Sequence, residues 1–116
     1  MPVYADPVDG VAIEAAELES WTATLVERLG TPVDIAIDVA TVLVASDRRG
    51  IASHGTARLP RYAIHVEQAT MDPKARPELL RERPAMAFFD AHNGWGHHAG
   101  RVAADAAIKG ARSAGS

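Results

Sequence analysis

Apolar residues recur at every third or fourth position near the start of the chain. The recurring positions are Leu18, Trp21, Leu25 and Leu29, with Thr22 and Val26 beside them. This period predicts an amphipathic helix from about Ala12 to Leu29, with that set as its buried face. Gly30 predicts the helix end, because glycine readily adopts the left-handed conformation of a C-terminal cap.

The same period predicts a second helix directly afterwards. Thr31 can cap it, Pro32 suits its first position, and Asp34 lies near the positive end of its dipole. Its expected apolar face consists of Ile35, Ala36, Val39, Leu43 and Val44. Gly50 ends the segment, and the short turn at Gly30 predicts an antiparallel helical hairpin.

The most polar stretch of the chain covers residues 48–62, RRGIASHGTARLPRY. We expect a short helix from about Ser53 to Glu67. Proline lacks a backbone N–H and clashes with the preceding turn, so Pro60 should make this helix irregular or split it.

Strand patterns follow. Residues 78–83 and 85–90 predict two short strands on either side of Pro84, and residues 91–97 form a glycine-rich loop. A last helix is expected over residues 98–114, with Val102, Ala106, Ala107 and Ile108 on its apolar side. The elements predict an α+β, mostly helical chain with an irregular arm over residues 1–10. A strand, loop and helix without a return strand suggest an incomplete sheet.

Composition narrows the possible classes of protein. The chain has 116 residues, about one domain, and 47% hydrophobic residues argue against general disorder. The net charge of −3 gives no reason to expect nucleic acid. The absence of cysteine excludes disulfides and thiolate metal sites. With no apolar segment long enough for a membrane and no signal-peptide pattern, we expect a cytoplasmic protein.

The glycine-rich loop permits two interpretations. Gly94-Trp95-Gly96 with Gly100, between a strand and a helix, could bring backbone N–H groups to a dinucleotide pyrophosphate. The spacing differs from the usual fingerprint, and Trp95 is large for a loop that must approach a phosphate. We favour a tight turn into the helix, with Gly100 allowing close packing.

Other polar residues suggest weaker sites. We expect no metal site, because the histidines lack converging ligands. Solvation in the loop or helix capping should account for His92, His97 and His98, and His65 should be partly buried. A helix-turn-helix over residues 32–67 is disfavoured by the lack of a basic recognition helix; its arginines are Arg48, Arg49, Arg58 and Arg61.

Ser53 and His54 carry the most specific chemistry. If residues 53–62 are helical, His54, Arg58 and Tyr62 recur every four positions and share one face. An imidazole, with an ordinary pKa of about 6.5, can protonate a carbonyl oxygen, and a guanidinium can bind a carboxylate through two hydrogen bonds. Tyr62 adds a hydrogen bond, and Ser53 can orient the imidazole. The set suits a 2-oxo or 2-hydroxy acid, but the spacing equally fits a capped helix whose polar face meets solvent.

The polar stretch also resembles a known family signature. Residues 46–55, SDRRGIASHG, and 58–62, RLPRY, resemble the A-D-x-R-G-I-x-S-H-G-x-x-R-L-P-x-Y pattern of the malate/L-lactate dehydrogenase family. Residues 84–96 and 99–115 are similar to the family's strand, turn and following helix. The resemblance covers nearly the whole chain from about Leu18. Ser46, Ala91 and Gly110 depart from the pattern.

The resemblance implies that Ser53, His54 and Arg58 line a substrate site, with Tyr62 a neighbour. It implies a non-Rossmann oxidoreductase fold, NAD or NADP as cofactor, and a 2-oxo or 2-hydroxy acid such as malate or lactate as substrate. Residues 11–116 would be the N-terminal portion of such an enzyme, without the C-terminal part that holds the nicotinamide-contacting residues. We therefore expect little activity from this chain alone.

Association is a further expectation. Exposed apolar surface on the strand and last helix should make the chain self-associate, as a homodimer, or bind a missing C-terminal portion. The alternative is a small non-catalytic helical module that binds a protein partner through its arginine-rich face and apolar strand.

Overall fold

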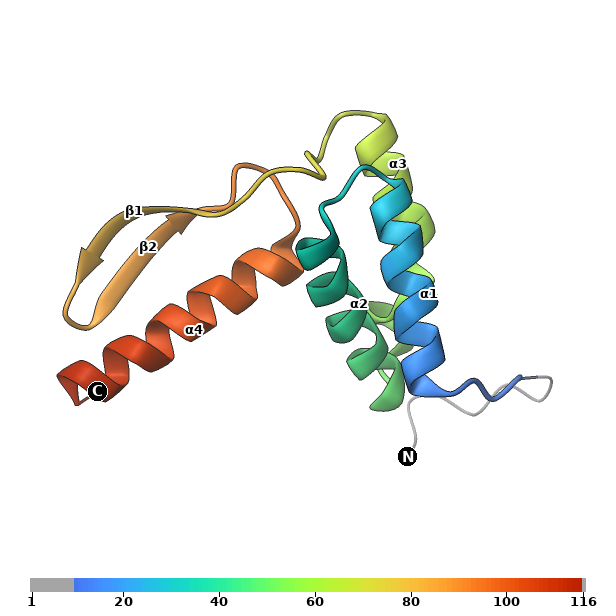
Figure 1. The fold of residues 1–116 in the computed structure, drawn as a ribbon, viewed down its shortest axis with the longest axis horizontal. Helices are drawn as coiled ribbons and strands as arrows, with labels where there is room; N and C mark the ends of the chain where they lie inside the picture. The colour runs from blue at the N-terminus through green and yellow to red at the C-terminus, as the bar shows by residue number, and fades with distance from the viewer. Residues whose placement is uncertain (1–9, 116) are drawn as a thin grey trace.

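The computed structural model describes residues 10–115 (Figure 1). All but the last residue of the arm expected over residues 1–10 therefore lie outside the described residues. The elements are α1 (Ala15–Arg28), α2 (Val33–Arg48), the short 3₁₀ turns Ala52–His54 and Thr56–Arg58, α3 (Leu59–Glu67), β1 (Glu78–Arg83), β2 (Met86–Asp90) and α4 (Gly96–Ala114). None of the helices in this part of the chain is long and apolar enough to cross a membrane.

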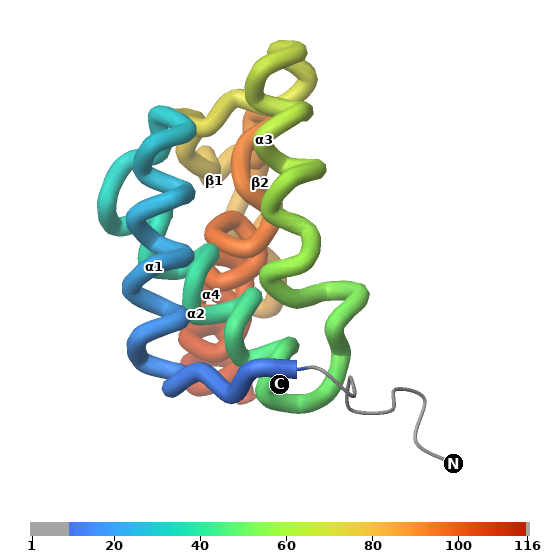
Figure 2. The backbone as a smooth tube through the Cα atoms, turned by 90° about the vertical axis from the view of Figure 1, so that its right-hand side faces the viewer, coloured from blue at the N-terminus to red at the C-terminus, as the bar shows by residue number. Residues whose placement is uncertain are grey.

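The predicted helical hairpin is confirmed. The buried side chains of α2 include the whole predicted apolar face and Ala40 as well: Ile35, Ala36, Val39, Ala40, Leu43 and Val44. Gly30, with φ +92°, follows α1 in the left-handed conformation expected of a helix end. Figure 2 shows α1 and α3 on opposite sides of the view, with α2 between them.

The predicted buried face of α1 is only partly right. Thr22 and Val26 are buried, whereas Trp21 is 52% exposed and Leu25 49% exposed. Adjacent helical residues point about 100° apart. Helix α1 therefore contacts α2 through the Thr22–Val26 line, and Trp21 and Leu25 point away from it. The sequence shows an apolar stripe but cannot show which part of the stripe the next helix will cover.

The helix expected from Ser53 to Glu67 begins later. Gly55 is extended, with φ −100° and ψ −156°, and it separates the two 3₁₀ turns from each other. The α-helix starts at Leu59, with Pro60 in its first turn. Proline's missing N–H has no intrahelical partner to lose there. Pro60 therefore marks the start of α3, and the split lies on its N-terminal side.

The two predicted strands form an antiparallel hairpin. Glu78 pairs with Asp90 and Arg83 with Met86, with an irregularity between Leu79 and Arg81. The hairpin and α4 lie side by side and extend away from α1–α3 (Figure 1). We call residues 78–114 the hairpin lobe and α1–α3 the helical lobe.

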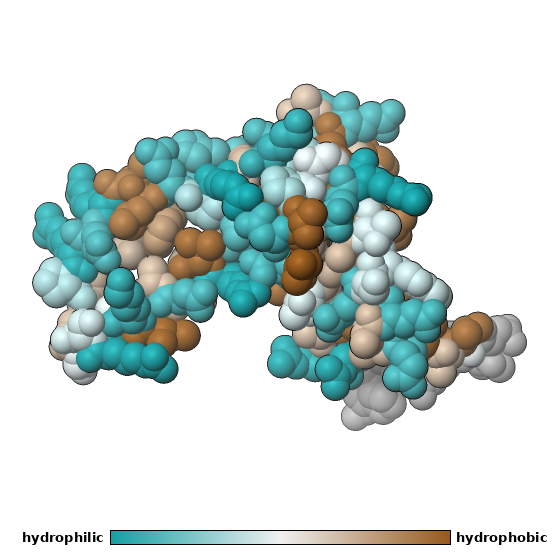
Figure 3. All heavy atoms as spheres, viewed as in Figure 1, coloured by the Kyte–Doolittle hydropathy of each residue, from teal (hydrophilic) through white to brown (hydrophobic). Residues whose placement is uncertain are grey.

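Most side chains of the hairpin lobe are exposed to solvent. On α4, which begins two residues before its predicted start, Val102 and Ala106 are half-buried, but Ala107 and Ile108 are exposed, contrary to prediction. Figure 3 shows apolar side chains at the surface of both lobes. The exposed large ones include Trp21, Leu25, Val33, Ile37, Leu79, Leu80, Met86, Phe88 and Ile108.

Trp95 connects the two lobes. It is 2% exposed and belongs to the same buried cluster as Val26, Ile35 and Leu43. Its Nε1–H donates to Oγ1 of Thr31 at 2.9 Å. The prediction that Thr31 caps α2 is therefore wrong. Pro32 is the N-cap residue, and no side chain caps this helix.

Candidate active site

Ser53 and His54 form a hydrogen-bonded pair on the first 3₁₀ turn. The Ser53 Oγ and the His54 Nδ1 are 2.8 Å apart, and both side chains are exposed. A hydroxyl can donate to an unprotonated Nδ1 or accept from a protonated one. Ser53 can therefore hold the ring in one orientation in either protonation state. This pairing leaves the Nε2 of His54 as the nitrogen that can reach a ligand.

The turn is attached to the end of α2 by Asp47. Its Oδ2 accepts hydrogen bonds from the backbone N–H and the hydroxyl of Thr56, at 3.0 and 2.7 Å. Gly55 lies beneath the same carboxylate and is buried. Sequence reasoning missed this role of Asp47. The only signal was its place in the motif, eight residues before Gly55.

Arg58 lies at the end of the second 3₁₀ turn and is exposed. Because the extended Gly55 interrupts the helical conformation between them, the expectation that His54 and Arg58 share one helical face is wrong. Arg58 itself has helical dihedral angles, φ −81° and ψ −15°, as the residue before α3. Its four-residue spacing to Tyr62 therefore still favours one side of that helix.

Tyr62 points to a different set of residues. Its ring meets Trp95 and His97 edge to face, with ring centroids 5.4 Å apart in both cases. Its hydroxyl oxygen lies 3.5 Å from Nε2 of His97. The predicted site residues are thus not all together: Ser53 pairs with His54, Tyr62 lies among its aromatic neighbours, and Arg58 is exposed between them along the chain.

The histidines near α4 are not simply solvated. Nδ1 of His98 lies 2.7 Å from Oδ2 of Asp38, with each side chain only 12% exposed. Arg101 binds the other oxygen of Asp38, so this carboxylate links α2 to α4. The expected solvation or capping is therefore wrong for His98. His92 does lie exposed in the loop, where its Nε2 is 2.7 Å from Glu78.

His97 also departs from the expected solvation. Burial lowers its pKa below the ordinary value of 6.5. Its Nδ1 is inaccessible to solvent and has no hydrogen-bond partner among the described residues.

His65, half-buried as predicted, pairs through Nδ1 with the Thr70 hydroxyl at 2.9 Å. Within residues 10–115 no three His, Cys, Asp or Glu side chains converge to hold a metal ion.

The glycine-rich loop is a turn into α4, as we favoured. The Gly94 N–H donates to the Ala91 carbonyl at 2.9 Å, and α4 begins at Gly96. A Cβ on Gly94 would stand 3.0 Å from both the Cβ and the carbonyl oxygen of Ala75, so this glycine permits a close approach of two chain segments. The predicted packing role of Gly100 is wrong, because a Cβ there would meet nothing within 4 Å.

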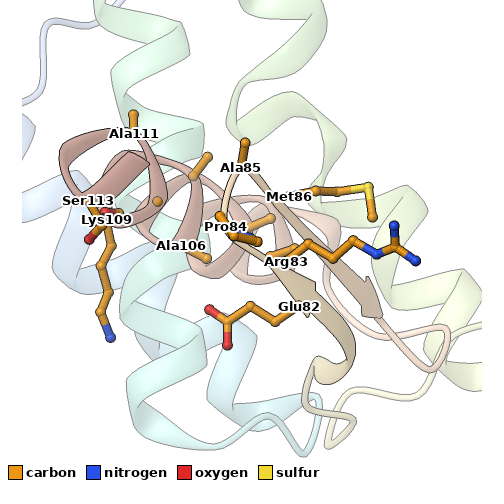
Figure 4. Close-up of a pocket in the computed structure, with 13 residues that line it drawn as sticks. Glu82, Arg83, Pro84, Ala85, Met86, Ala106, Lys109, Ala111 and Ser113 are labelled. Atoms are coloured by element: carbon orange, nitrogen blue, oxygen red, sulfur yellow. Dashed lines mark hydrogen bonds between the residues drawn. The ribbon is translucent and has the colours of Figure 1, made fainter. Parts of the chain in front are cut away.

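A groove of about 670 Å³ lies between the hairpin and α4 (Figure 4). Its lining is mostly apolar and includes Pro84, Met86, Ala106 and Ala111, with Lys109 at its side. None of the predicted site residues lines it. The groove is thus a feature of the hairpin lobe and not of the Ser53–His54 turn.

Comparison with known proteins relates nearly the whole chain to one group of enzymes. A family model described as malate/L-lactate dehydrogenase matches residues 13–116. A malate dehydrogenase of Pyrococcus abyssi is 37% identical over 105 residues, which cover 90% of this chain and 29% of the relative. An L-lactate dehydrogenase of Cupriavidus necator is 38% identical over 84 residues, which cover 72% of this chain and 24% of the relative.

Solved structures agree. The malate dehydrogenase of Pyrococcus horikoshii superimposes with a TM-score of 0.86 at 31% identity, covering 94% of this chain and 31% of that one. The sulfolactate dehydrogenase of Methanocaldococcus jannaschii gives a TM-score of 0.83 at 28% identity, covering 88% and 30%. This chain thus spans less than a third of the length of these four relatives. It belongs to the malate/L-lactate dehydrogenase family.

Proposed function

We propose that this chain supplies substrate-binding and proton-transfer residues of an oxidoreductase that interconverts a 2-oxo and a 2-hydroxy acid. The observation that carries the proposal is the Ser53–His54 pair on its anchored turn. The names of the relatives support the substrate class, since malate, lactate and sulfolactate are all 2-hydroxy acids. The chain would form the N-terminal portion of the enzyme, in a non-Rossmann fold.

His54 is the proposed proton donor. With Nδ1 fixed by Ser53, its Nε2 would give a proton to the oxygen of a 2-oxo acid as the carbonyl carbon is reduced. The same nitrogen would accept that proton when a hydroxyl is oxidised. Because the proton moves only at Nε2, Nδ1 keeps its own proton in both states, and the Ser53 oxygen accepts from it throughout, which keeps the imidazole oriented in both directions of the reaction.

Arg58 is the proposed carboxylate ligand. A guanidinium presents several N–H donors in one plane and can bind both oxygens of a carboxylate. Its exposed position next to the turn is compatible with this role. Tyr62, four residues further along and on the same side of the helix, would add one hydrogen bond to the same ligand.

The cofactor would be NAD or NADP, and a related ureidoglycolate dehydrogenase of Escherichia coli is named for NAD(+). When bound, a nicotinamide supplies or accepts the hydride. The loop at Gly94–Gly96 does not fit its pyrophosphate, because Trp95 is buried in the core and Gly94 faces Ala75. The cofactor would therefore be held by other residues, and this chain would contribute proton transfer and substrate binding.

Complementation tests the proposal. The full chain would be mixed with the part of the Pyrococcus abyssi relative that it does not match, and NADH and NADPH oxidation measured with pyruvate, oxaloacetate and sulfopyruvate. We expect activity only in the mixture. His54→Ala should lower turnover about a hundredfold or more, as for loss of a general acid. The matched control is His92→Ala, which removes an exposed histidine outside the turn.

Each result has a defined meaning. Turnover by the chain alone would contradict the view that its cofactor is held elsewhere. An unchanged rate in His54→Ala would remove this residue from the mechanism. No turnover in any mixture would favour the non-catalytic binding module. Sedimentation of the purified chain tests the proposed self-association, which the exposed apolar residues of both lobes support.

A further inference from the structure

We infer that His97 is a positioning residue: its Nε2–H donates to the Tyr62 hydroxyl oxygen, which leaves the phenol proton to donate to an oxygen of the bound acid. The inference rests on the proposed function, because it assigns Tyr62 its role toward the substrate. The location of the proton on Nε2 of His97 is a property of the chain alone.

The geometry places the two side chains against each other. His97 is the second residue of α4, and Tyr62 lies in the first half of α3. Their rings are nearly perpendicular, at 84°, and the hydroxyl oxygen is 3.5 Å from Nε2. This distance is long for a hydrogen bond, and catalytic hydrogen bonds are often long before substrate binds. Trp95 packs against both rings and limits their movement.

The surroundings of Nδ1 determine which nitrogen carries the proton. A neutral imidazole has one N–H donor and one acceptor nitrogen. Nδ1 of His97 is buried without a partner among the described residues. Buried N–H groups without an acceptor are rarer than unpaired acceptors. The proton therefore belongs on Nε2, facing Tyr62. Burial keeps the ring neutral near pH 7 by lowering the pKa.

This assignment fixes the direction of the Tyr62 hydroxyl. A phenol has one donor and can accept through its oxygen. If the oxygen accepts from His97, the O–H has to find a different acceptor. Arg58 lies four residues earlier, on the same side of the helical backbone. A carboxylate bound by Arg58 would thus receive a second donor from Tyr62.

Nitrogen NMR of the full chain tests the hydrogen bond without any enzyme assay. In uniformly ¹⁵N-labelled protein at pH 7, we expect His97 to carry its proton on Nε2 and to have an unprotonated Nδ1. Tyr62→Phe should shift the Nε2 resonance, whereas Thr24→Val, a control that removes an exposed hydroxyl of α1, should not. A proton on Nδ1 would overturn the inference, and so would an Nε2 chemical shift that is unchanged in Tyr62→Phe.

Kinetics in the complemented mixture test the role toward substrate. His97→Leu should raise KM for the 2-oxo acid about three- to tenfold, the usual worth of one neutral hydrogen bond, with a smaller change in kcat. Tyr62→Phe should do the same, and the double variant should add nothing. His97→Gln, which keeps an N–H at similar reach, should restore the wild-type KM.

The two experiments separate the possible failures. An unchanged KM in His97→Leu, or additive effects in the double variant, would overturn the positioning role even with the expected NMR result. An inactive wild-type mixture would contradict the proposed function and the substrate half of this inference. In that case the NMR measurement still decides whether His97 donates to Tyr62.

Discussion

The carboxylate of Asp47 occupies the space that any side chain at Gly55 would need. A Cβ built on Gly55 would stand 1.7 Å from Oδ1 of Asp47 and 2.4 Å from its Cγ. The φ of Gly55 is −100°, which any residue can adopt, so space and not backbone conformation requires glycine here. The same carboxylate holds Thr56, so Gly55 allows α2 to fix the turn that carries Ser53 and His54.

Gly55→Ala should therefore loosen the site turn. The new methyl group would displace Asp47 and break its two hydrogen bonds to Thr56. We expect a loss of about 1–3 kcal/mol in the free energy of unfolding, the usual cost of overpacking or of a broken buried hydrogen bond. Urea denaturation measures the loss. Altered amide resonances of Ser53 and His54 would show that the turn has moved.

Two further variants make this prediction specific. Gly100→Ala places a methyl group on α4 where a Cβ meets nothing within 4 Å. It should stabilise the chain by about 0.5–1 kcal/mol, because alanine is the better helix former. Adding Asp47→Ala to Gly55→Ala removes the clash, so the two substitutions should not be additive. Fully additive losses would contradict the steric explanation.

Thr31→Val tests the contact between the two lobes. Valine has a similar shape but no hydroxyl, so the Nε1–H of the buried Trp95 would lose its acceptor. We expect a loss of about 1–3 kcal/mol, since an unpaired donor in the core retains its full desolvation penalty. The measurement is the urea midpoint at unchanged slope. The matched control is Thr24→Val, whose hydroxyl makes an exposed bond to Ser20 and should matter little. Equal losses in both variants would contradict the importance of the Trp95 bond.

The sequence predicted the first two helices and both strands well because their signals are local, whereas the helix expected from Ser53 begins only at Leu59. The apolar period and Gly30 were enough for the α1–α2 hairpin, and both strands were predicted nearly to the residue. The buried positions of α2 were also predictable, since this helix is covered on its whole apolar face. Trp21 and Leu25 were misassigned because burial depends on what packs against α1, and sequence period does not contain that information.

The candidate site could be predicted only in part. The motif identified Ser53 and His54, which the structure pairs, because adjacent residues on a tight turn stay together. Contacts between distant segments were not predictable. Asp38 with His98 is one example, and Tyr62 with His97 is another, at 60 and 35 residues of separation. Each depends on how α4 docks against the helical lobe, and no local pattern encodes that docking.

Asp34 and Arg76 give a prediction at low pH. The two side chains form a double hydrogen bond, 2.8 and 2.9 Å long, near the start of α2. Hydrogen bonding to Arg76 lowers the pKa of Asp34 from 3.8 to about 2. The pair therefore stabilises the fold above pH 3.8, and this contribution is lost as the pH falls toward 2.

Substitution of Arg76 tests that cause. Arg76→Ala should raise the pKa of Asp34 toward 3.8, as measured by carboxyl ¹³C NMR. Arg76→Lys keeps the charge but not the two-point geometry. The pKa of Asp34 in this variant should therefore lie between its values in wild type and in Arg76→Ala. Because both side chains are more than half exposed, salt should weaken the effect. An unchanged pKa in Arg76→Ala would assign the shift to another group.

His97 predicts a loss of stability in mild acid. Burial lowers its pKa in the folded chain, whereas the unfolded chain titrates near the ordinary 6.5. As the pH falls below about 6.5, the unfolded state binds a proton that the folded state does not, so the free energy of unfolding decreases. The decrease should end once the pH falls below the lowered folded-state pKa.

His97→Gln removes this contribution, so the difference in free energy of unfolding between wild type and variant should shrink as the pH falls from 7.5 to 5. Ala104→Gln introduces the same side chain at an exposed position of α4 and should run parallel to wild type. A constant difference for His97→Gln across this range would show that His97 is protonated equally in both states.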